Sequence, residues 1–295
     1  MRILVIGKTG QLAKSLLCSL RAVKSKHNFV FVSRVQIDLI NVKSIYAYLD
    51  SEAFDVVVNC AAYTAVDNAE LEPDIAYAVN CHAVDALSEI CSRKKIKFIH
   101  ISTDYVFDGN SDEPYKEEDK PSPINIYGNS KLYGEKKILR NMPKDAIIIR
   151  TSWLYSIYGN NFVNSIINAA NSNRKMDVIS DQIGAPTFAS DLSELILIII
   201  NAYNERFSWG GSQIYHFSNN GKCSWFDFAS EIVSISNIDC DINPIPSNQY
   251  KKMKAKRPKN SVLSKEKVQS RFDIKIPNWD ESLKKCISTL SNTQL

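Results

Sequence analysis

Tyr127 and Lys131 are the residues of this chain whose types and spacing most clearly predict chemistry. They lie four residues apart, and on a helix that spacing places both side chains on one face. The pKa of a tyrosine is ordinarily ~10, and a neighbouring ammonium favours the phenolate and lowers it. We therefore expect Lys131 to bring the pKa of Tyr127 close to neutral pH, where a phenol is a useful acid or base. Such a pair also occurs by chance, so the interpretation needs support from other motifs.

A glycine-containing turn follows the first apolar run of the chain. Gly7 and Gly10 stand in the stretch GKTGQLA, between a predicted strand and a predicted helix. Gly7 permits a tight turn, and Gly10 lets the backbone approach a pyrophosphate whose charge suits a helix N-terminus. The third small residue, Ala13, still allows the helix to pack closely on the strand. A turn without a ligand is the alternative interpretation.

The end of the second predicted strand bears on the choice of cofactor. An acidic residue there would bind the ribose hydroxyl of NAD, whereas a basic residue would accept the 2′-phosphate of NADP. This chain has Ser33 and Arg34 at that place, which favours NADPH, with NADH as the alternative. Arg34 is equally compatible with a solvent-facing position. Asp38 lies four residues further on and is a candidate contact for the adenine end.

Two further motifs follow the third and fourth predicted strands. Small residues in the stretch NCAAYT, from Asn59 to Thr64, would leave room for a flat ligand at the edge of the sheet. Ser102, Thr103 and Asp104 follow the next strand, where a hydroxyl can hold a substrate carbonyl or hydrogen-bond to Tyr127. A purely structural hydroxyl is the alternative, but its combination with Tyr127 and Lys131 favours catalysis.

Candidate substrate contacts are less specific. Lys256 and Arg257 could bind a diphosphate through charge and a bidentate fork, and Trp153 and Phe162 could flank a sugar or a base. Each of these side chains is equally compatible with a place in the core or on the surface. The basic run from Lys251 to Arg257 has the same two interpretations, a solvated loop or a surface that meets an anionic substrate.

Composition excludes several classes of protein. The chain has 295 residues, of which 44% are hydrophobic and 23% charged, and a net charge of +4 does not favour nucleic acid binding. The seven cysteines and four histidines lack the spacing of a metal or redox motif, so we expect free thiols, structural histidines and no metal site. The N-terminus reads as a strand instead of a signal peptide, and the apolar run 195–200 is too short to cross a bilayer. We therefore expect a cytoplasmic protein with no membrane partner.

The first half of the chain alternates strand and helix patterns. Short apolar runs rich in Val and Ile are typical of strands buried on both faces, and these are predicted at 3–6, 29–33, 56–59, 98–103 and 147–150. Amphipathic stretches between them predict helices at 12–23, 44–49 and 75–93. This order favours a doubly wound α/β domain, Rossmann-like, with a mostly parallel sheet.

The rhythm changes after about residue 160. A helix is predicted from 160–162 onward, a short strand at 178–180, a helix at 191–201 and a last strand at 215–217. We therefore expect a nucleotide-binding domain over residues 1–160, with its sheet completed by segments near 178–220. Residues 161–295 are expected to form mainly a smaller substrate-binding lobe.

These motifs together resemble the dTDP-4-dehydrorhamnose reductases, a branch of the extended short-chain dehydrogenase/reductases. The resemblance runs from Met1 to about Trp279, and its landmarks are GKTGQL, NCAAYTAVD, STDYVFD, YGNSK, RTSW, DQIGAPT and RP. It implies NADPH-dependent reduction of the C4 ketone of dTDP-6-deoxy-L-lyxo-4-hexulose to dTDP-L-rhamnose, a precursor for polysaccharide synthesis. The alternatives are reduction of another dTDP- or UDP-sugar, or a non-catalytic NADP-binding regulatory subunit.

The resemblance also implies residue roles. Tyr127 would give its proton to the nascent alkoxide, Lys131 would hold the nicotinamide ribose, and Thr103 would tune Tyr127. Substrate contacts are implied for Thr103, Asp104 and Trp153, to which the diphosphate candidate Arg257 is added. The implied cofactor contacts, together with those argued from the residues, are Gly7, Gly10, Gln11, Leu12, Arg34, Asp38, Leu39, Ala62, Tyr63, Thr64, Tyr127 and Lys131.

One departure from the family concerns assembly. Some relatives hold magnesium at a dimer interface through acidic side chains, and this chain has Ser15 and Ser190 near those places. The departure disfavours a magnesium-linked dimer and leaves a monomer and a homodimer open.

Overall fold

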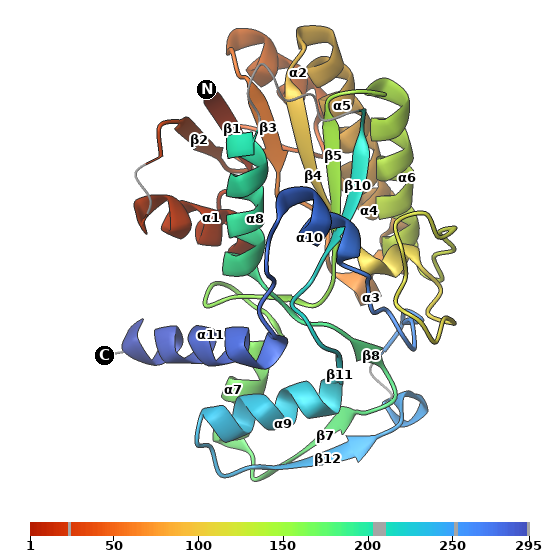
Figure 1. Ribbon diagram of the computed structural model, residues 1–295. Coiled ribbons are helices and arrows are strands. Elements are labelled where there is room, and N and C mark those ends of the chain that lie inside the picture. The colour runs from red at the N-terminus through yellow and green to blue at the C-terminus, as the bar shows by residue number, and fades with distance from the viewer. Residues whose placement is uncertain (23–24, 203–210, 251–252, 294–295) are drawn as a thin grey trace.

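Six strands form one parallel sheet in the computed structural model (Figure 1). The model describes residues 1–22, 25–202, 211–250 and 253–293. The strand order is β2-β1-β3-β4-β5-β10, and every neighbouring pair is parallel. The strands are β1 (Arg2–Ile6), β2 (Asn28–Val32), β3 (Val56–Asn59), β4 (Lys97–Thr103), β5 (Ala146–Thr151) and β10 (Gln213–Phe217). The expected α/β fold with a parallel sheet is confirmed.

Helices cover both faces of this sheet. One face meets α1 (Gln11–Ala22) and α8 (Ala189–Ala202), and the other meets α2 (Val42–Ser51), α5 (Ala83–Lys94) and α6 (Ile126–Asn141). Side chains alternate between the faces along a strand, so in β1 Ile3 and Val5 pack toward α1 and α8 while Leu4 and Ile6 pack toward the other helices. All four are at most 1% exposed, which explains why the strands lack polar alternation.

The helix predicted at 75–93 is divided. It consists of α4 (Pro73–Tyr77), a π-helical turn η1 (Ala78–His82) and α5. A Cβ on Gly134 of α6 would lie 2.2 Å from the carbonyl oxygen of Asn80, so a glycine is needed where α6 crosses this turn. The side-chain amide of Asn80 bonds to both backbone groups of Tyr63 and to the Ser130 hydroxyl, and thereby ties the turn to α6.

A smaller lobe lies at the carboxyl ends of the strands, in the lower half of Figure 1. Its core combines α7 (Phe162–Ser172), α9 (Trp225–Ile235) and α11 (Trp279–Thr293). Three two-stranded sheets complete it, and they pair β7 (Lys175–Ile179) with β12 (Asp241–Ile245), β8 (Ile183–Gly184) with β11 (Cys223–Ser224), and β6 (Leu154–Tyr155) with β9 (Thr187–Phe188). The predicted strand near 178 therefore pairs with β12, and the expectation that it would help complete the main sheet is wrong. Among the later strands in the part of the chain that the structure describes, only β10 joins that sheet.

The remaining elements are short connections. They are α3 (Val66–Ala69), the 3-10 turns η2 (Asp104–Val106) and η3 (Ser247–Gln249), and α10 (Glu266–Phe272). In the sheet, β2 lies on one side of β1 and β3 lies on the other side. The chain therefore crosses over β1 between β2 and β3, and the direction of winding reverses between β1 and β3. In open α/β sheets ligands bind at the carboxyl ends of strands beside such a reversal.

Candidate active site

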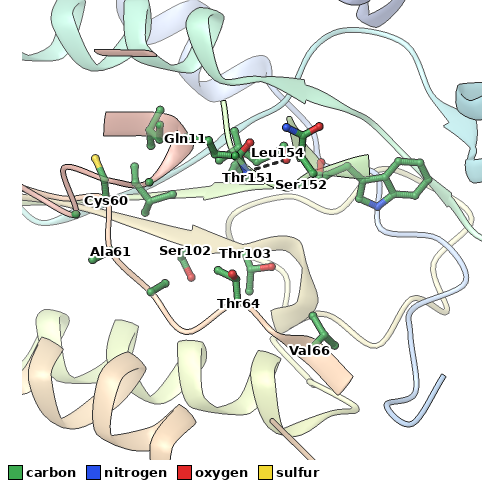
Figure 2. A pocket seen from close by; sticks show the side chains of 18 of the residues that line it. Gln11, Cys60, Ala61, Thr64, Val66, Ser102, Thr103, Thr151, Ser152 and Leu154 are labelled. Atoms are coloured by element: carbon green, nitrogen blue, oxygen red, sulfur yellow. Dashed lines mark hydrogen bonds between the residues drawn. The ribbon is translucent and has the colours of Figure 1, made fainter. Parts of the chain in front are cut away.

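A cavity of about 620 Å³ opens where the sheet meets the lobe. This volume is within the range of small-molecule sites. Figure 2 shows Cys60, Ala61 and Thr64 after β3, Ser102 and Thr103 at the end of β4, Thr151 at the end of β5 and Ser152 directly after it, around one space. The carboxyl edge of the sheet therefore forms one wall. Trp225 of the lobe lines the same cavity and supplies part of the opposite wall.

The glycine turn lies at the β1 side of this cavity. Gly7 has a φ of +96°, a conformation that favours glycine, and the backbone N–H groups of Gly7 and Lys8 both donate to the carbonyl of Val32. A Cβ on Gly7 would lie 3.1 Å from Ala61, so this turn and the β3 loop approach closely only because Gly7 has no side chain. The side-chain amide of Gln11 donates to the carbonyl of Leu154 and accepts from the hydroxyl of Ser156, which ties the start of α1 to the segment after β5, and Gly10, Gln11 and Leu12 line the cavity. This arrangement fits a dinucleotide pyrophosphate.

Tyr127 is held at the cavity by the first turn of α6. The side chain of Asn125 caps this helix by accepting a hydrogen bond of 2.7 Å from the N–H of Gly128. A Cβ on Gly128 would lie 2.0 Å from the carbonyl oxygen of Tyr105, so glycine at this position lets α6 contact η2. The ring of Tyr127 packs edge-on against that of Tyr105, with centroids 5.8 Å apart. Thr103, Tyr127 and Lys131 all line the cavity.

The pKa of Tyr127 differs from our expectation. Burial raises it to about 12, a hydrogen bond with Thr103 opposes the rise, and the charge of Asp104 adds to it. The expected lowering by Lys131 is wrong for this geometry, because the Nζ atom of Lys131 contacts the Ile101 carbonyl at 2.6 Å and the His100 ring at 3.2 Å. Tyr127 therefore keeps its proton at neutral pH, as a proton donor must.

Lys131 and Asp104 are both shifted by burial. The pKa of Lys131 falls to about 8 because the ammonium is buried, although the charge of Glu135 opposes this. The pKa of Asp104 rises to about 7 through burial, against hydrogen bonds from Ser261 and Thr103. The Oδ2 atom of Asp104 is buried without a hydrogen-bond partner, which is costly unless a proton or a ligand group satisfies it.

Trp153 stands between the sheet and the lobe. Its backbone φ is +47°, and its indole stacks on that of Trp225 at a centroid distance of 3.5 Å and an interplanar angle of 8°. A Cβ on Gly184 would lie 2.5 Å from the same indole. The aromatic wall of the cavity thus depends on a strained backbone position and on a glycine. The ring centroids of Phe162 and Trp225 lie 4.4 Å apart, so Phe162 packs against this aromatic wall.

Some predicted ligand contacts do not line the cavity. Arg34 forms an exposed ion pair with Asp38 at 3.2 Å. Arg257 makes a bidentate pair with Asp67, at 2.6 Å and 3.1 Å, and thereby ties the chain around residue 257 to α3. The predicted residues outside the cavity lining are Arg34, Asp38, Leu39, Tyr63 and Arg257, whereas Gly7, Gly10, Gln11, Leu12, Ala62, Thr64, Thr103, Asp104, Tyr127, Lys131 and Trp153 belong to it. The ligand roles of both groups remain predictions, and Lys251 and Lys252 of the basic run are outside the described residues.

Comparison with known proteins identifies the family. The model of the RmlD substrate binding domain matches residues 1–292. The chain is 38% identical to the dTDP-4-dehydrorhamnose reductase of Sinorhizobium fredii, with 98% of each chain covered. The chain belongs to the dTDP-4-dehydrorhamnose reductase family.

Solved structures of this reductase family share the fold. The Clostridium acetobutylicum dTDP-4-dehydrorhamnose reductase superposes with a TM-score of 0.91 at 35% identity, covering 99% of this chain and 100% of that one. The Bacillus anthracis dTDP-4-dehydrorhamnose reductase, solved in complex with NADP, gives 0.90 at 33% identity, covering 98% and 99%. The family resemblance inferred from the motifs is confirmed.

Several residues that line the reductase cavity were not predicted. Trp225 comes from α9 of the lobe, and Tyr158 and Asn161 lie in the segment between β6 and α7. One local signal was available, since Asn161 precedes a helical pattern and caps α7 by accepting from the N–H of Asn164. Nothing in the local sequence around Trp225 distinguishes it from a core aromatic residue.

Within residues 1–22, 25–202, 211–250 and 253–293 no three His, Cys, Asp or Glu side chains are grouped as metal ligands. No helix in these same ranges is long and apolar enough to cross a bilayer.

Proposed function

We propose that this protein uses NADPH to reduce the C4 ketone of dTDP-6-deoxy-L-lyxo-4-hexulose, giving dTDP-L-rhamnose. The observation that carries the proposal is that Thr103, Tyr127 and Lys131 line one cavity together with the glycine turn that follows β1. The similarity to the dTDP-4-dehydrorhamnose reductase of Sinorhizobium fredii supports the substrate, and the NADP complex of the Bacillus anthracis relative supports the cofactor.

Each side chain has a defined part in this reaction. When bound, the nicotinamide supplies the hydride. Tyr127 donates its phenolic proton to the oxygen at C4, and Thr103 holds the phenol by a hydrogen bond. The Lys131 ammonium stabilises negative charge at this place, and Asp104, whose Oδ2 atom has no partner, meets a sugar hydroxyl.

Different residues would bind the two ends of the substrate. Trp153, stacked on Trp225, offers an apolar surface to the deoxysugar. Arg257 is a candidate contact for the diphosphate, and such a contact would compete with or extend its existing pair with Asp67. Arg34, which is exposed, is the candidate for the 2′-phosphate of NADPH.

The test is turnover with the purified protein. NADPH oxidation should depend on dTDP-6-deoxy-L-lyxo-4-hexulose, and NMR of the product should give the rhamno configuration at C4. Tyr127→Phe should lose at least ~100-fold in kcat, the lower range for a general acid, while NADPH affinity stays within about twofold. Tyr133→Phe, on the exposed part of the same helix, is the matched control and should keep full activity.

Other outcomes would change the conclusion. Turnover only with a different dTDP- or UDP-sugar would retain the reductase and replace its substrate. Binding of NADPH without turnover of any 4-keto sugar would favour a regulatory NADP-binding role and contradict the proposal.

A further inference from the structure

His100 lies behind the catalytic residues, with no part in the reaction proposed above. It belongs to β4 and is completely buried, between Asn59 of β3 and Lys131 of α6. The distances from its Nδ1 atom to the Asn59 Nδ2 atom and from its Nε2 atom to the Lys131 Nζ atom are both 3.2 Å. From the sequence, His100 was expected to have only a structural role.

The hydrogen bonds of Asn59 give this chain of groups a direction. The Oδ1 atom of Asn59 accepts the backbone N–H of Ala61 at 3.1 Å, which fixes the amide orientation. Its Nδ2 group must then donate to His100 Nδ1. A neutral imidazole that accepts at Nδ1 carries its hydrogen on Nε2, so an N–H of His100 points at Lys131.

An N–H directed at Lys131 favours one protonation state of that side chain. An ammonium has only donors, whereas a neutral amine has one lone pair and two hydrogens. The amine can therefore accept from His100 Nε2 and still donate to the carbonyl of Ile101 at 2.6 Å. An ammonium would place two donors against each other.

We propose that His100 is a positioning residue whose fixed Nε2–H tautomer stabilises the neutral amine of Lys131 and so sets the pH at which Lys131 releases its proton. The catalytic meaning of this inference rests on the proposed reductase function. The hydrogen-bond chain from Asn59 through His100 to Lys131 does not depend on that function.

The other charged groups around Lys131 act in a known direction. Glu135, one turn further along α6, favours the ammonium, but its carboxylate is paired with Arg150 of β5 at 2.7 Å. Tyr127 and Asp104 line the same cavity. Burial lowers the pKa of Lys131 to about 8, and burial together with the charge of Lys131 keeps the pKa of His100 well below its ordinary value. Both shifts agree with a neutral ring facing an amine.

A second buried histidine provides an internal comparison. The Nδ1 atom of His216 lies 3.1 Å from the carbonyl of Tyr115, which can only accept, so His216 carries its hydrogen on Nδ1. Its Nε2 atom is left to accept from Arg150 at 3.4 Å. The two buried rings should therefore be opposite tautomers.

The tautomers can be read directly by NMR of protein with ¹⁵N-labelled histidine side chains, without substrate. Between about pH 5 and about pH 9 we expect two neutral rings that do not titrate, one with Nε2–H and one with Nδ1–H. His100→Leu should remove the Nε2–H ring, which assigns it. A His100 ring with Nδ1–H, or a charged ring in this range, would overturn the inference.

A substitution at Asn59 tests the effect on Lys131. Asn59→Asp still accepts from Ala61 but presents an acceptor to His100, so the ring should move its hydrogen to Nδ1 or become charged. In the neutral ring with its hydrogen on Nδ1, the Nε2 atom then accepts from the ammonium of Lys131. In the charged ring, Nε2 keeps its N–H beside Lys131. We expect the neutral ring with Nδ1–H, and with it a pKa of Lys131 that is raised by at least about one unit, which is a tenfold change in proton affinity. The readout is ¹³C NMR titration of labelled lysine, with Lys131→Arg for assignment.

The control distinguishes the effect of the His100 ring on Lys131 from the effect of the new negative charge at residue 59. In the double variant Asn59→Asp/His100→Leu the carboxylate remains but no ring connects it to Lys131, so the rise should shrink by at least about half. An equal rise in both proteins would overturn the role of His100. Because neither titration needs turnover, failure of the proposed reaction would be recognised separately by the absence of NADPH oxidation.

Discussion

Arg150 of β5 and Glu135 of α6 form a doubly hydrogen-bonded ion pair inside the protein, with side chains that are 2% and 1% exposed. The Nε and Nη2 atoms of Arg150 lie 2.9 Å and 2.7 Å from the two carboxylate oxygens, and Ser102, which lines the cavity, donates to the same carboxylate at 2.5 Å. The pair therefore fastens the helix that carries Tyr127 and Lys131 to the sheet at the cavity.

Removal of one partner of this pair should be strongly destabilising. Arg150→Met leaves the carboxylate of Glu135 buried without compensation, and we expect a loss of about 3–5 kcal/mol in the free energy of unfolding. Urea denaturation measures this value. The double variant Arg150→Met/Glu135→Leu should recover most of the loss, and equal losses in the single and double variants would contradict the assignment.

Gly128 should not tolerate a side chain. The Cβ of Gly128→Ala would meet the carbonyl oxygen of Tyr105 at 2.0 Å, so the first turn of α6 must move and carry Tyr127 with it. We expect a loss of about 1–3 kcal/mol in stability, as for other overpacked sites, together with a lower kcat. Gly159→Asn is the control, because its Cβ meets nothing within 4 Å and asparagine tolerates the φ of +68°. Equal effects at the two positions would show that the contact with Tyr105 does not matter.

The activity should fall at alkaline pH because of Lys131. Its pKa is lowered by burial to about 8, so the ammonium is present below that pH and is lost above it. The pKa of Tyr127 is raised to about 12, so the phenol stays protonated over the same range. We expect kcat with saturating NADPH to decline as the pH rises through about 8.

A permanently charged side chain is the control for this pH dependence. A guanidinium keeps its proton throughout this range, so Lys131→Arg should have a lower kcat but no decline near the pKa of Lys131. A decline of wild-type kcat only near the ordinary lysine value would contradict the burial effect.

Trp225 should influence binding of the sugar more than binding of the cofactor. Trp225→Ala removes the stacking partner of Trp153, and an aromatic pair of this kind contributes about 0.5–1.5 kcal/mol. We expect KM for the sugar nucleotide to rise about 3–10-fold, with KM for NADPH nearly unchanged. Trp279→Phe, which alters another aromatic contact of the same lobe core, is the control. Equal increases in both KM values would mean that Trp225 acts through the stability of the lobe.

The limits of sequence reasoning are clear at Tyr127 and Lys131. Their spacing correctly predicted that both lie on one helix and line one cavity, because helical periodicity is local. The pKa of Tyr127 was predicted in the wrong direction, because burial by residues distant in sequence raises it and Lys131 contacts Ile101 and His100 instead.

Trp153 and its stacking partner Trp225 also differ in what the sequence could predict. Trp153 followed a recognisable motif, but Trp225 is 72 positions later and reaches it only when the lobe that contains α9 packs at the carboxyl ends of the strands. Likewise, Arg257 was considered as a diphosphate contact, whereas the folded chain gives it Asp67 as a partner.

The order of apolar runs, amphipathic helices and small-residue turns was enough to determine a parallel sheet with a ligand site at its carboxyl edge, because those preferences depend on near neighbours in the chain. The pairing of β7 with β12, the contacts of His100 with Asn59 and Lys131, and the burial of Lys131 were decided only by the tertiary structure. Each of these depends on groups brought together from separate parts of the chain, and a solvent-excluded environment does not exist before those parts pack.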